Sequence, residues 1–280
     1  MSARHRPLRV GSVPYLVGRP LDSGLEKEPG IELVRRVPAQ LVDSLRAGEI
    51  DVALVSSIEL FRRPGYRWID GLAVAGEGFV ASVQVFLRKP IADVRSLALD
   101  PSSRTAATLV RVLFERRLGG ADGLPRGTVE FRETAAPDDP RAAGTDAWLR
   151  IGDPALCEWL APGAPPVFNP SQVWSERTGL PFVFACWIVR PGVELSDAEI
   201  AAFVRSRALG TSRREELSRD AASAWSLPLE ACRKYLLEEC RYDPGHAMHA
   251  ALRRFRDEAA AIGLCESALD PRPIEIMHVA

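Results

Sequence analysis

The sequence contains few of the residues that mark metal sites, disulfide frameworks or membrane spans. It has five cysteines and four histidines among 280 residues, and neither set shows the close spacing of metal ligands. The cysteines are scattered and odd in number, which is typical of reduced thiols. No uninterrupted apolar run approaches the roughly 20 residues of a membrane-spanning helix. We therefore expect no metal and no membrane partner.

The chain also lacks an excess of charge of either sign. Its 36 basic and 37 acidic residues leave a formal net charge of -1, without a basic block. Such a balance gives no attraction to nucleic acid or to an anionic membrane surface. Residues 1–7 carry charge without an apolar segment behind them, so we expect no export signal and a cytoplasmic location. A small molecule is the expected partner, and the sequence does not indicate an oligomeric state.

What the sequence does contain is an alternation of short apolar runs with segments of helical spacing. The runs predict strands, and most of them precede a stretch with apolar residues three and four apart. Beyond Gly192 only helical spacing continues. The alternation predicts an α/β protein with parallel sheets, and a new strand-helix series near residue 88 predicts two lobes with a cleft between them. The strongest strand predictions are residues 8–13, 31–37, 51–55, 68–74, 81–87, 94–99, 127–132, 147–151 and 182–189.

The most informative stretch is residues 98–105 (ALDPSSRT), where an apolar strand ends and a helix is expected to begin. Ser102 or Ser103 stands where that helix needs an N-cap. A helix start with hydroxyl groups and the guanidinium of Arg104 is suited to hold a carboxylate or a phosphate. The alternative is that the serine only caps the helix and that Arg104 only meets solvent.

Further polar side chains stand where predicted strands end. Ligands of open α/β sheets bind at those ends. Ser56 and Ser57 are expected to cap a second helix. Asp153 could act as a general base, although an Asp before a Pro at this point is also typical of a helix cap. The strand ends carry Ser12, Ser56, Ser57, Ser103, Arg104 and Asp153.

Six segments in matching order resemble the chorismate dehydratase family of menaquinone biosynthesis. They are residues 9–16 (RVGSVPYL), 19–21 (RPL), 51–55 (DVALV), 103–105 (SRT), 151–153 (IGD) and 178–185 (TGLPFVFA). The resemblance implies a two-lobed type II periplasmic-binding-protein-like α/β fold with a ligand cleft between the lobes. It also implies a first lobe of residues 1–87 with 188–280, which includes the C-terminal helices, and a second lobe of residues 88–187.

The resemblance further implies that the chain removes water from chorismate, a dicarboxylate, without a metal or an organic cofactor. The product would be 3-[(1-carboxyvinyl)oxy]benzoate. Besides the strand-end residues, the resemblance places Tyr15, Thr105 and Thr178 at the substrate. Ser82 matches a serine of the family and is a candidate catalytic residue beside Asp153, its alternative being a buried serine bonded to the backbone. A carboxylate of the substrate is a second candidate for the base.

None of the four histidines (His5, His246, His249 and His278) falls in a predicted cleft motif. This weighs against the similar dihydroxynaphthoate synthases, which use a histidine.

One position departs from the family pattern. Many relatives have an asparagine two residues after the aromatic residue of the first segment, where this chain has Val17. An amide donates and accepts hydrogen bonds, and valine does neither. Either the Gly18 backbone, Arg19 or Ser12 takes over that role, or the reaction differs. The alternative function is a non-catalytic protein that binds a small carboxylate. A regulatory domain would need a DNA-binding segment, which residues 1–8 are too short to form.

Overall fold

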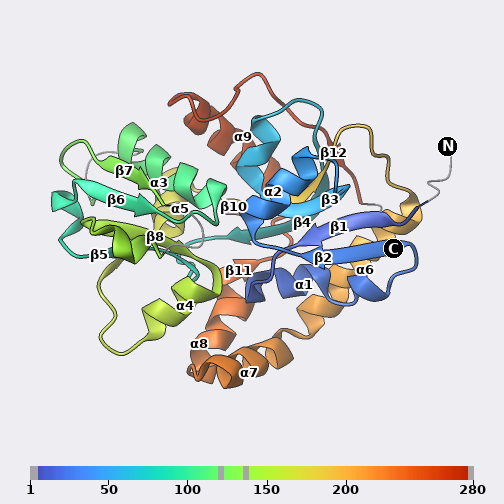
Figure 1. The fold of residues 1–280 in the computed structure, drawn as a ribbon, viewed down its shortest axis with the longest axis horizontal. Helices are drawn as coiled ribbons and strands as arrows, with labels where there is room; N and C mark the ends of the chain where they lie inside the picture. Colours follow the sequence, from blue (N-terminus) through green and yellow to red (C-terminus); the bar gives the residue numbers. More distant parts are fainter. Residues whose placement is uncertain (1–5, 119–122, 135–138, 277–280) are drawn as a thin grey trace.

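The computed structural model describes residues 6–118, 123–134 and 139–276. Two β-sheets lie one after the other along the longest axis of the molecule, with helices packed against them (Figure 1). The first sheet has the strand order β11-β4-β10-β3-β1-β2, with β12 paired to β4, and the second has the order β7-β6-β8-β5-β9.

The first sheet takes its strands from both halves of the sequence. β3 lies between β1 and β10 and is buried along its whole length, which agrees with its apolar sequence. The short strands β11 and β12 come from the segment after Gly192, where we expected helices alone. The strands are β1 Leu8–Ser12, β2 Ile31–Arg35, β3 Val52–Ser56, β4 Arg67–Gly76, β10 Phe182–Val189, β11 Cys240–Arg241 and β12 Pro273–Ile274.

The second sheet consists of β5 Val83–Leu87, β6 Ser96–Leu99, β7 Glu130–Glu133, β8 Ala147–Ile151 and β9 Val167–Phe168. β5 runs antiparallel to β8 and β9, and in the first sheet β10 runs antiparallel to β3 and β4. The prediction of parallel sheets is therefore wrong, since both sheets are mixed. A strand buried on both faces is equally apolar in either direction, so composition could not reveal its orientation.

Helices cover both faces of the first sheet, with α2 and α9 on one side and α1 and α6 on the other (Figure 1). Within the described ranges, none of the helices combines the length and apolar character needed to cross a membrane. The α-helices are α1 Arg19–Asp22, α2 Pro38–Arg46, α3 Arg104–Arg116, α4 Gly152–Leu160, α5 Pro170–Thr178, α6 Asp197–Ser212, α7 Arg214–Trp225, α8 Leu229–Arg233 and α9 Ala247–Ala260. Short 3-10 helices are η1 Leu16–Gly18, η2 Leu25–Lys27, η3 Ser57–Phe61, η4 Ile91–Asp93 and η5 Pro140–Ala143, and η6 Lys234–Glu239 is a π-helix.

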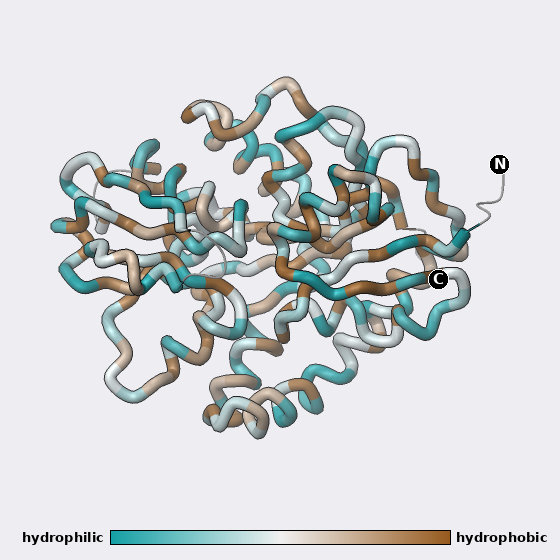
Figure 2. Tube along the Cα trace, viewed as in Figure 1, coloured by the Kyte–Doolittle hydropathy of each residue, from teal (hydrophilic) through white to brown (hydrophobic). Residues whose placement is uncertain are grey.

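Apolar residues gather along the strands of both sheets (Figure 2). An aromatic cluster joins elements that are far apart in the sequence. The ring of Trp174 in α5 packs edge-on against Phe182 in β10 and Phe255 in α9, with centroid distances of 5.4 and 6.0 Å. Such contacts add to the free energy of burying the rings themselves. The cluster therefore fixes α5 against the first sheet near the start of β10, the strand by which the chain returns to that sheet.

The predicted lobes, residues 1–87 with 188–280 and residues 88–187, remain a prediction that the strand pairing refines. β5 pairs within the second sheet, although it lies before residue 88, and β10 pairs within the first sheet, although it begins before residue 188. We propose that the chain crosses between the lobes at about residues 77–82 and 179–181.

Candidate functional site

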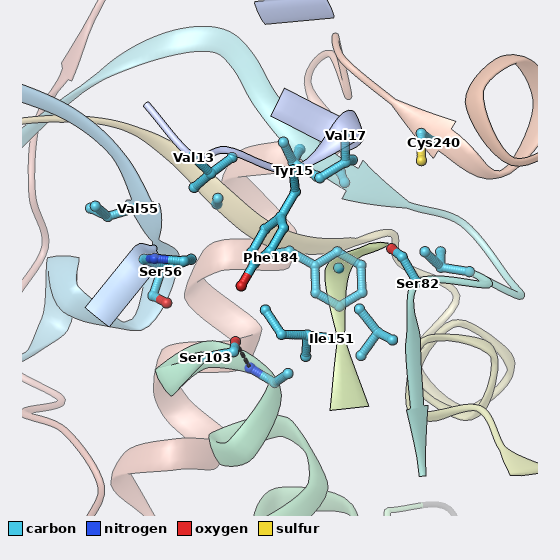
Figure 3. Close-up of a pocket in the computed structure, with 18 residues that line it drawn as sticks. Val13, Tyr15, Val17, Val55, Ser56, Ser82, Ser103, Ile151, Phe184 and Cys240 are labelled. Carbon is cyan, nitrogen blue, oxygen red and sulfur yellow. Dashed lines mark hydrogen bonds between the residues drawn. The ribbon is translucent and has the colours of Figure 1, made fainter. Parts of the chain in front are cut away.

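A pocket lies between the two sheets and takes side chains from both (Figure 3). Its space is about 630 Å³, a value that includes the opening to solvent. Most of the lining is apolar, and no charged side chain occurs among the described lining residues. They are Val13, Tyr15, Val17, Pro38, Val55, Ser56, Val74, Ala75, Val80, Ser82, Val83, Ser103, Ala106, Ile151, Gly152, Phe184, Ala185 and Cys240.

Four predicted site residues, Tyr15, Ser56, Ser82 and Ser103, line this pocket. In Figure 3 the hydroxyl of Tyr15 points toward the side where Ser56 and Ser103 lie, and Ser82 stands on the opposite side of Phe184. The pocket therefore has hydroxyl groups toward two ends and apolar side chains between them. Such a lining suits a ligand with polar groups at both ends of a ring.

Ser103 is the N-cap of α3, as the sequence predicts. Its Oγ accepts a hydrogen bond from the Ala106 backbone N–H at 3.1 Å. A serine oxygen that accepts keeps its own O–H free to donate, and the N-terminus of a helix carries partial positive charge. This end of the pocket is therefore suited to an anionic group although it has no cation.

The Tyr15 ring packs directly on the backbone of Gly152. A Cβ at Gly152 would lie 2.9 Å from Tyr15 Cδ1, and Gly152 has a φ of +67°. Both observations require glycine at this position. Burial raises the pKa of Tyr15, while the Ser102 hydroxyl lowers it, so the phenol stays protonated and can donate a hydrogen bond.

The Asp153 carboxylate accepts the Leu16 backbone N–H at 2.9 Å to Oδ1 and 3.2 Å to Oδ2. The N-cap of α4 is Ile151, so the expectation that Asp153 caps its own helix is wrong. Burial raises the pKa of Asp153 to about 6, while the Leu16 N–H and the charge of Arg19 act in the opposite direction. Asp153 is not among the residues that line the pocket, and it ties α4 to η1 instead.

The other predicted ligands are not among the lining residues, and three of them bond to nearby backbone. Ser57 Oγ donates to the Val183 carbonyl at 2.6 Å. Thr105 Oγ1 accepts the Ile58 N–H at 3.3 Å, and Thr178 Oγ1 donates to the Trp174 carbonyl at 2.8 Å. Ser57 and Thr178 use their donor hydrogen in these bonds, whereas Thr105 accepts and keeps its own O–H free to donate. A direct role for the three hydroxyls in substrate binding remains a prediction.

Ser56 and Ser57 do not cap a helix as expected. Neither makes a side-chain capping bond, and the element that follows is a 3-10 helix of five residues. Consecutive residues at a strand end point to opposite sides, so Ser56 faces the pocket while Ser57 faces β10.

Ser12 and Arg104 also lie apart from the pocket lining. Ser12 is fully buried, and its Oγ has no hydrogen-bond partner in the described part of the chain. Arg104 Nη2 forms an ion pair with Asp43 Oδ1 at 2.9 Å and lines a neighbouring cavity. The pocket and that cavity share Ser103.

The segment that presents Ser82 is held by two buried polar side chains that sequence reasoning missed. Ala81 N donates to Glu239 Oε2 at 2.8 Å, and Asn169 Nδ2 donates to the Val80 carbonyl at 2.9 Å. Burial raises the pKa of Glu239, while the Ala81 N–H lowers it. In the sequence Glu239 is only a glutamate beside apolar residues in a segment with helical spacing. That pattern does not predict that its carboxylate bonds to the backbone of Ala81.

A cluster of neutral donors lies behind Ser82 and was also missed. Tyr235 and Tyr242 are buried, and neither hydroxyl has a hydrogen-bond partner within residues 6–118, 123–134 and 139–276. Burial raises the pKa of Tyr235 well above its usual value, Cys240 and Tyr242 raise it further, and the Ser82 hydroxyl lowers it. Burial likewise raises the pKa of Cys240 to about 12. Tyr235 lies on the π-helix η6, an element often found at functional sites.

Histidines and metal ligands do not contribute to this geometry. His249 pairs with Asp70 at 2.9 Å, and neither His246 nor His249 lines the pocket. His5 and His278 lie outside the described residues. Where the chain is described, no three His, Cys, Asp or Glu side chains are grouped as metal ligands.

Comparison with known proteins gives consistent results. Residues 8–261 match the model of a family described as menaquinone biosynthesis. A chorismate dehydratase of Thermus thermophilus is 29% identical over 238 residues, covering 76% of this chain and 81% of that protein. A chorismate dehydratase of Campylobacter jejuni is 30% identical over 188 residues, covering 62% of this chain and 64% of that protein.

A solved structure supports the fold. The alkanesulfonate-binding protein from Xanthomonas axonopodis pv. citri, bound to MOPS, superposes with a TM-score of 0.66 at 18% identity, covering 96% of this chain and 97% of that one. The fold is thus the two-lobed periplasmic-binding-protein-like α/β fold that the sequence resemblance implied.

Proposed function

Because the chain belongs to the menaquinone biosynthesis family, we propose that it is a chorismate dehydratase, a hydro-lyase that converts chorismate to 3-[(1-carboxyvinyl)oxy]benzoate and water. The family match over residues 8–261 carries this proposal, and the names of two relatives at about 30% identity agree with it. The pocket supports it, since chorismate is a ring with two carboxylates and a hydroxyl group.

The lining residues can hold such a substrate by hydrogen bonds alone. Tyr15, Ser56 and Ser103 would receive one carboxylate beside the N-terminus of α3, where the helix adds partial positive charge. The ring would lie among the apolar side chains near Phe184. Ser82 would face the ring hydroxyl that leaves. Neutral donors fixed in an apolar site stabilise developing negative charge more strongly than water does.

The reaction removes one proton and one hydroxyl group from adjacent ring carbons. The carbon that bears the ether loses its proton to a base, and the released electron pair forms the new ring double bond. The neighbouring C–O bond breaks, and the departing hydroxyl becomes water by taking up a proton, which balances the one that the base removed. The ring becomes aromatic, which drives the reaction. Ser82, as a neutral hydroxyl, would donate a hydrogen bond to the departing oxygen.

The described lining residues of the pocket include no evident general base for removal of the proton. Among its described lining residues none is a carboxylate, a histidine or a lysine, and the Asp153 carboxylate is bonded to the Leu16 N–H. We therefore propose that a carboxylate of the substrate removes the proton, and that Asp153 positions η1. In this mechanism the protein acts by orientation and by placing hydrogen-bond donors.

The test is incubation of the purified protein with chorismate while the diene absorbance is followed, with chromatographic detection of the benzoate product. Loss of absorbance together with product in equal amount is expected. Saturable binding of chorismate without product would contradict the proposal and favour the non-catalytic binding protein.

A further inference from the structure

A second cavity lies next to the pocket, and its lining includes three arginines and two carboxylates, Asp100 and Glu133. The Asp100 carboxylate accepts the backbone N–H groups of Ser102 and Ile151. Arg104 and Arg111 come from α3, Arg62 follows η3, and the space is about 820 Å³ including its opening. α3 follows β6 of the second sheet and η3 follows β3 of the first, so the cavity takes residues from both sides of the molecule. None of these guanidinium groups lines the pocket proposed for chorismate.

Two of the arginines have only weakly held counterions. Arg104 Nη2 lies 2.9 Å from Asp43 Oδ1, and the Asp43 side chain is 66% exposed. Arg111 Nη2 lies 2.7 Å from Glu133 Oε1, and the Glu133 side chain is 73% exposed. Ion pairs with exposed carboxylates contribute little, typically about 0.2–1 kcal/mol. Both carboxylates can therefore give way to a better placed anion.

Arg62 has no carboxylate partner within ion-pair distance in the described part of the chain, although it is half-buried. Its Nε donates to the Leu264 carbonyl at 3.3 Å, and its Nη2 lies 3.5 Å from Thr108 Oγ1. Both are long bonds to neutral oxygens. The guanidinium has five N–H donors, so much of its donor capacity remains for a ligand.

The carboxylate of Glu59 does not neutralise Arg62, because it is already engaged. Arg46 forms two bonds to it, at 2.7 and 2.6 Å. Burial lowers the pKa of Arg62, Glu59 raises it, and the charge of Arg104 lowers it again. Two guanidinium groups therefore repel each other across a partly buried space.

We propose that this cavity is a binding site for a small oxyanion, such as phosphate or a carboxylate, held by Arg62, Arg104 and Arg111 and separate from the chorismate pocket. Forked guanidinium groups match the oxygens of such anions. The anion expected at Arg104 from the sequence then binds beside the pocket rather than in it. An anion held here contacts residues from both sides of the molecule and stabilises the folded protein as it binds.

The test uses inorganic phosphate, titrated at constant ionic strength with chloride as the balancing salt. The melting temperature should rise with phosphate in a saturable manner, and calorimetry should give the dissociation constant. Arg62→Gln should weaken phosphate binding tenfold or more, since glutamine keeps a donor for Leu264 but has no charge. Arg63→Gln is the matched control, because Arg63 is exposed and outside the cavity, and it should bind like the parent.

Kinetics with chorismate decides whether the anion site is separate from the chorismate pocket. Saturating phosphate should leave the KM for chorismate unchanged, and Arg104→Gln should weaken phosphate binding without raising that KM. Competition between phosphate and chorismate, or a KM raised tenfold by Arg104→Gln, would assign the arginines to the substrate and overturn the separate site. Absence of a saturable shift, or equal weakening in Arg63→Gln, would overturn the anion site itself.

Discussion

The carboxylate of Asp153 in α4 accepts the backbone N–H of Leu16 in η1 at 2.9 Å. Leu16 is flanked by Tyr15 and Val17, which both line the pocket. α4 follows β8 of the second sheet, and η1 follows β1 of the first, so this hydrogen bond links the two sides of the molecule and fixes the position of two lining residues. The strength of this hydrogen bond depends on whether the buried Asp153 carboxyl is ionised, so it can be tested by changing the pH.

The first prediction concerns the pH dependence of stability. Burial raises the pKa of Asp153 from 3.8 to about 6, so the folded protein holds the proton more tightly than the unfolded chain does. The stabilisation from this group is fully present below pH 4 and is lost as pH rises to about 6. The expected loss is on the order of 2–3 kcal/mol. Urea unfolding of the parent and of Asp153→Asn between pH 4 and 7 measures it.

The difference between the two proteins isolates Asp153 from other titrating groups. Asparagine still accepts the Leu16 N–H but does not titrate, so the variant should become more stable relative to the parent as pH rises. Parallel stability curves would show that the Asp153 pKa is not raised.

The second prediction concerns Ser82. Its hydroxyl lines the pocket, and Ser82→Ala should lower kcat for chorismate by about 100-fold, as expected when a donor to developing charge is removed. Its melting temperature should stay close to the parent's. Loss of stability with activity per folded molecule retained would make Ser82 a structural residue.

Ser206→Ala is the matched control for Ser82→Ala. Ser206 is a buried serine of α6 whose Oγ donates to the Leu21 carbonyl at 3.0 Å, and it does not line the pocket. This variant should lose about 1 kcal/mol of stability and keep its kcat.

The third prediction concerns the two buried tyrosines. An unpartnered buried hydroxyl costs about 1–3 kcal/mol, so neither Tyr235→Phe nor Tyr242→Phe should destabilise the fold. The Ser82 hydroxyl lowers the pKa of Tyr235, which indicates that the two hydroxyls lie near each other although they are not hydrogen-bonded in this structure. We therefore expect Tyr235→Phe to change the surroundings of Ser82 and to lower kcat about tenfold at constant KM. Tyr242→Phe should leave kcat close to that of the parent. Equal effects of the two changes on kcat would contradict a specific role for Tyr235.

The fourth prediction concerns Val17. Val17→Asn places an amide in a largely apolar lining, where it can donate to the substrate, and we expect kcat/KM for chorismate to rise. Val17→Leu has nearly the shape of asparagine without its polar atoms and should not raise it. A gain in both variants would indicate a packing effect, and a loss in Val17→Asn would show that this pocket is adapted to valine.

The sequence by itself determined the elements and the family. Apolar runs marked β1, β3 and β10, and Ser103 was identified as a possible N-cap because both signals are local along the chain. The six matching segments led to the family, the fold and the proposed activity. The strand ends and the matching segments also predict Tyr15, Ser56, Ser82 and Ser103 as site residues, and all four line the pocket.

Only the tertiary structure decided strand direction and the second half of the site. β10 and β5 run antiparallel to neighbours that composition could not orient. The pairing of β11 with β4 brings Cys240, Tyr235 and Glu239 to the pocket region. The paired residues of these two strands are more than 160 residues apart in the sequence. Arg104 forms an ion pair with Asp43, and Ser57 donates a hydrogen bond to the Val183 carbonyl. Local patterns fix which residues form a strand or a helix, whereas side-chain partners depend on packing between elements distant in the sequence.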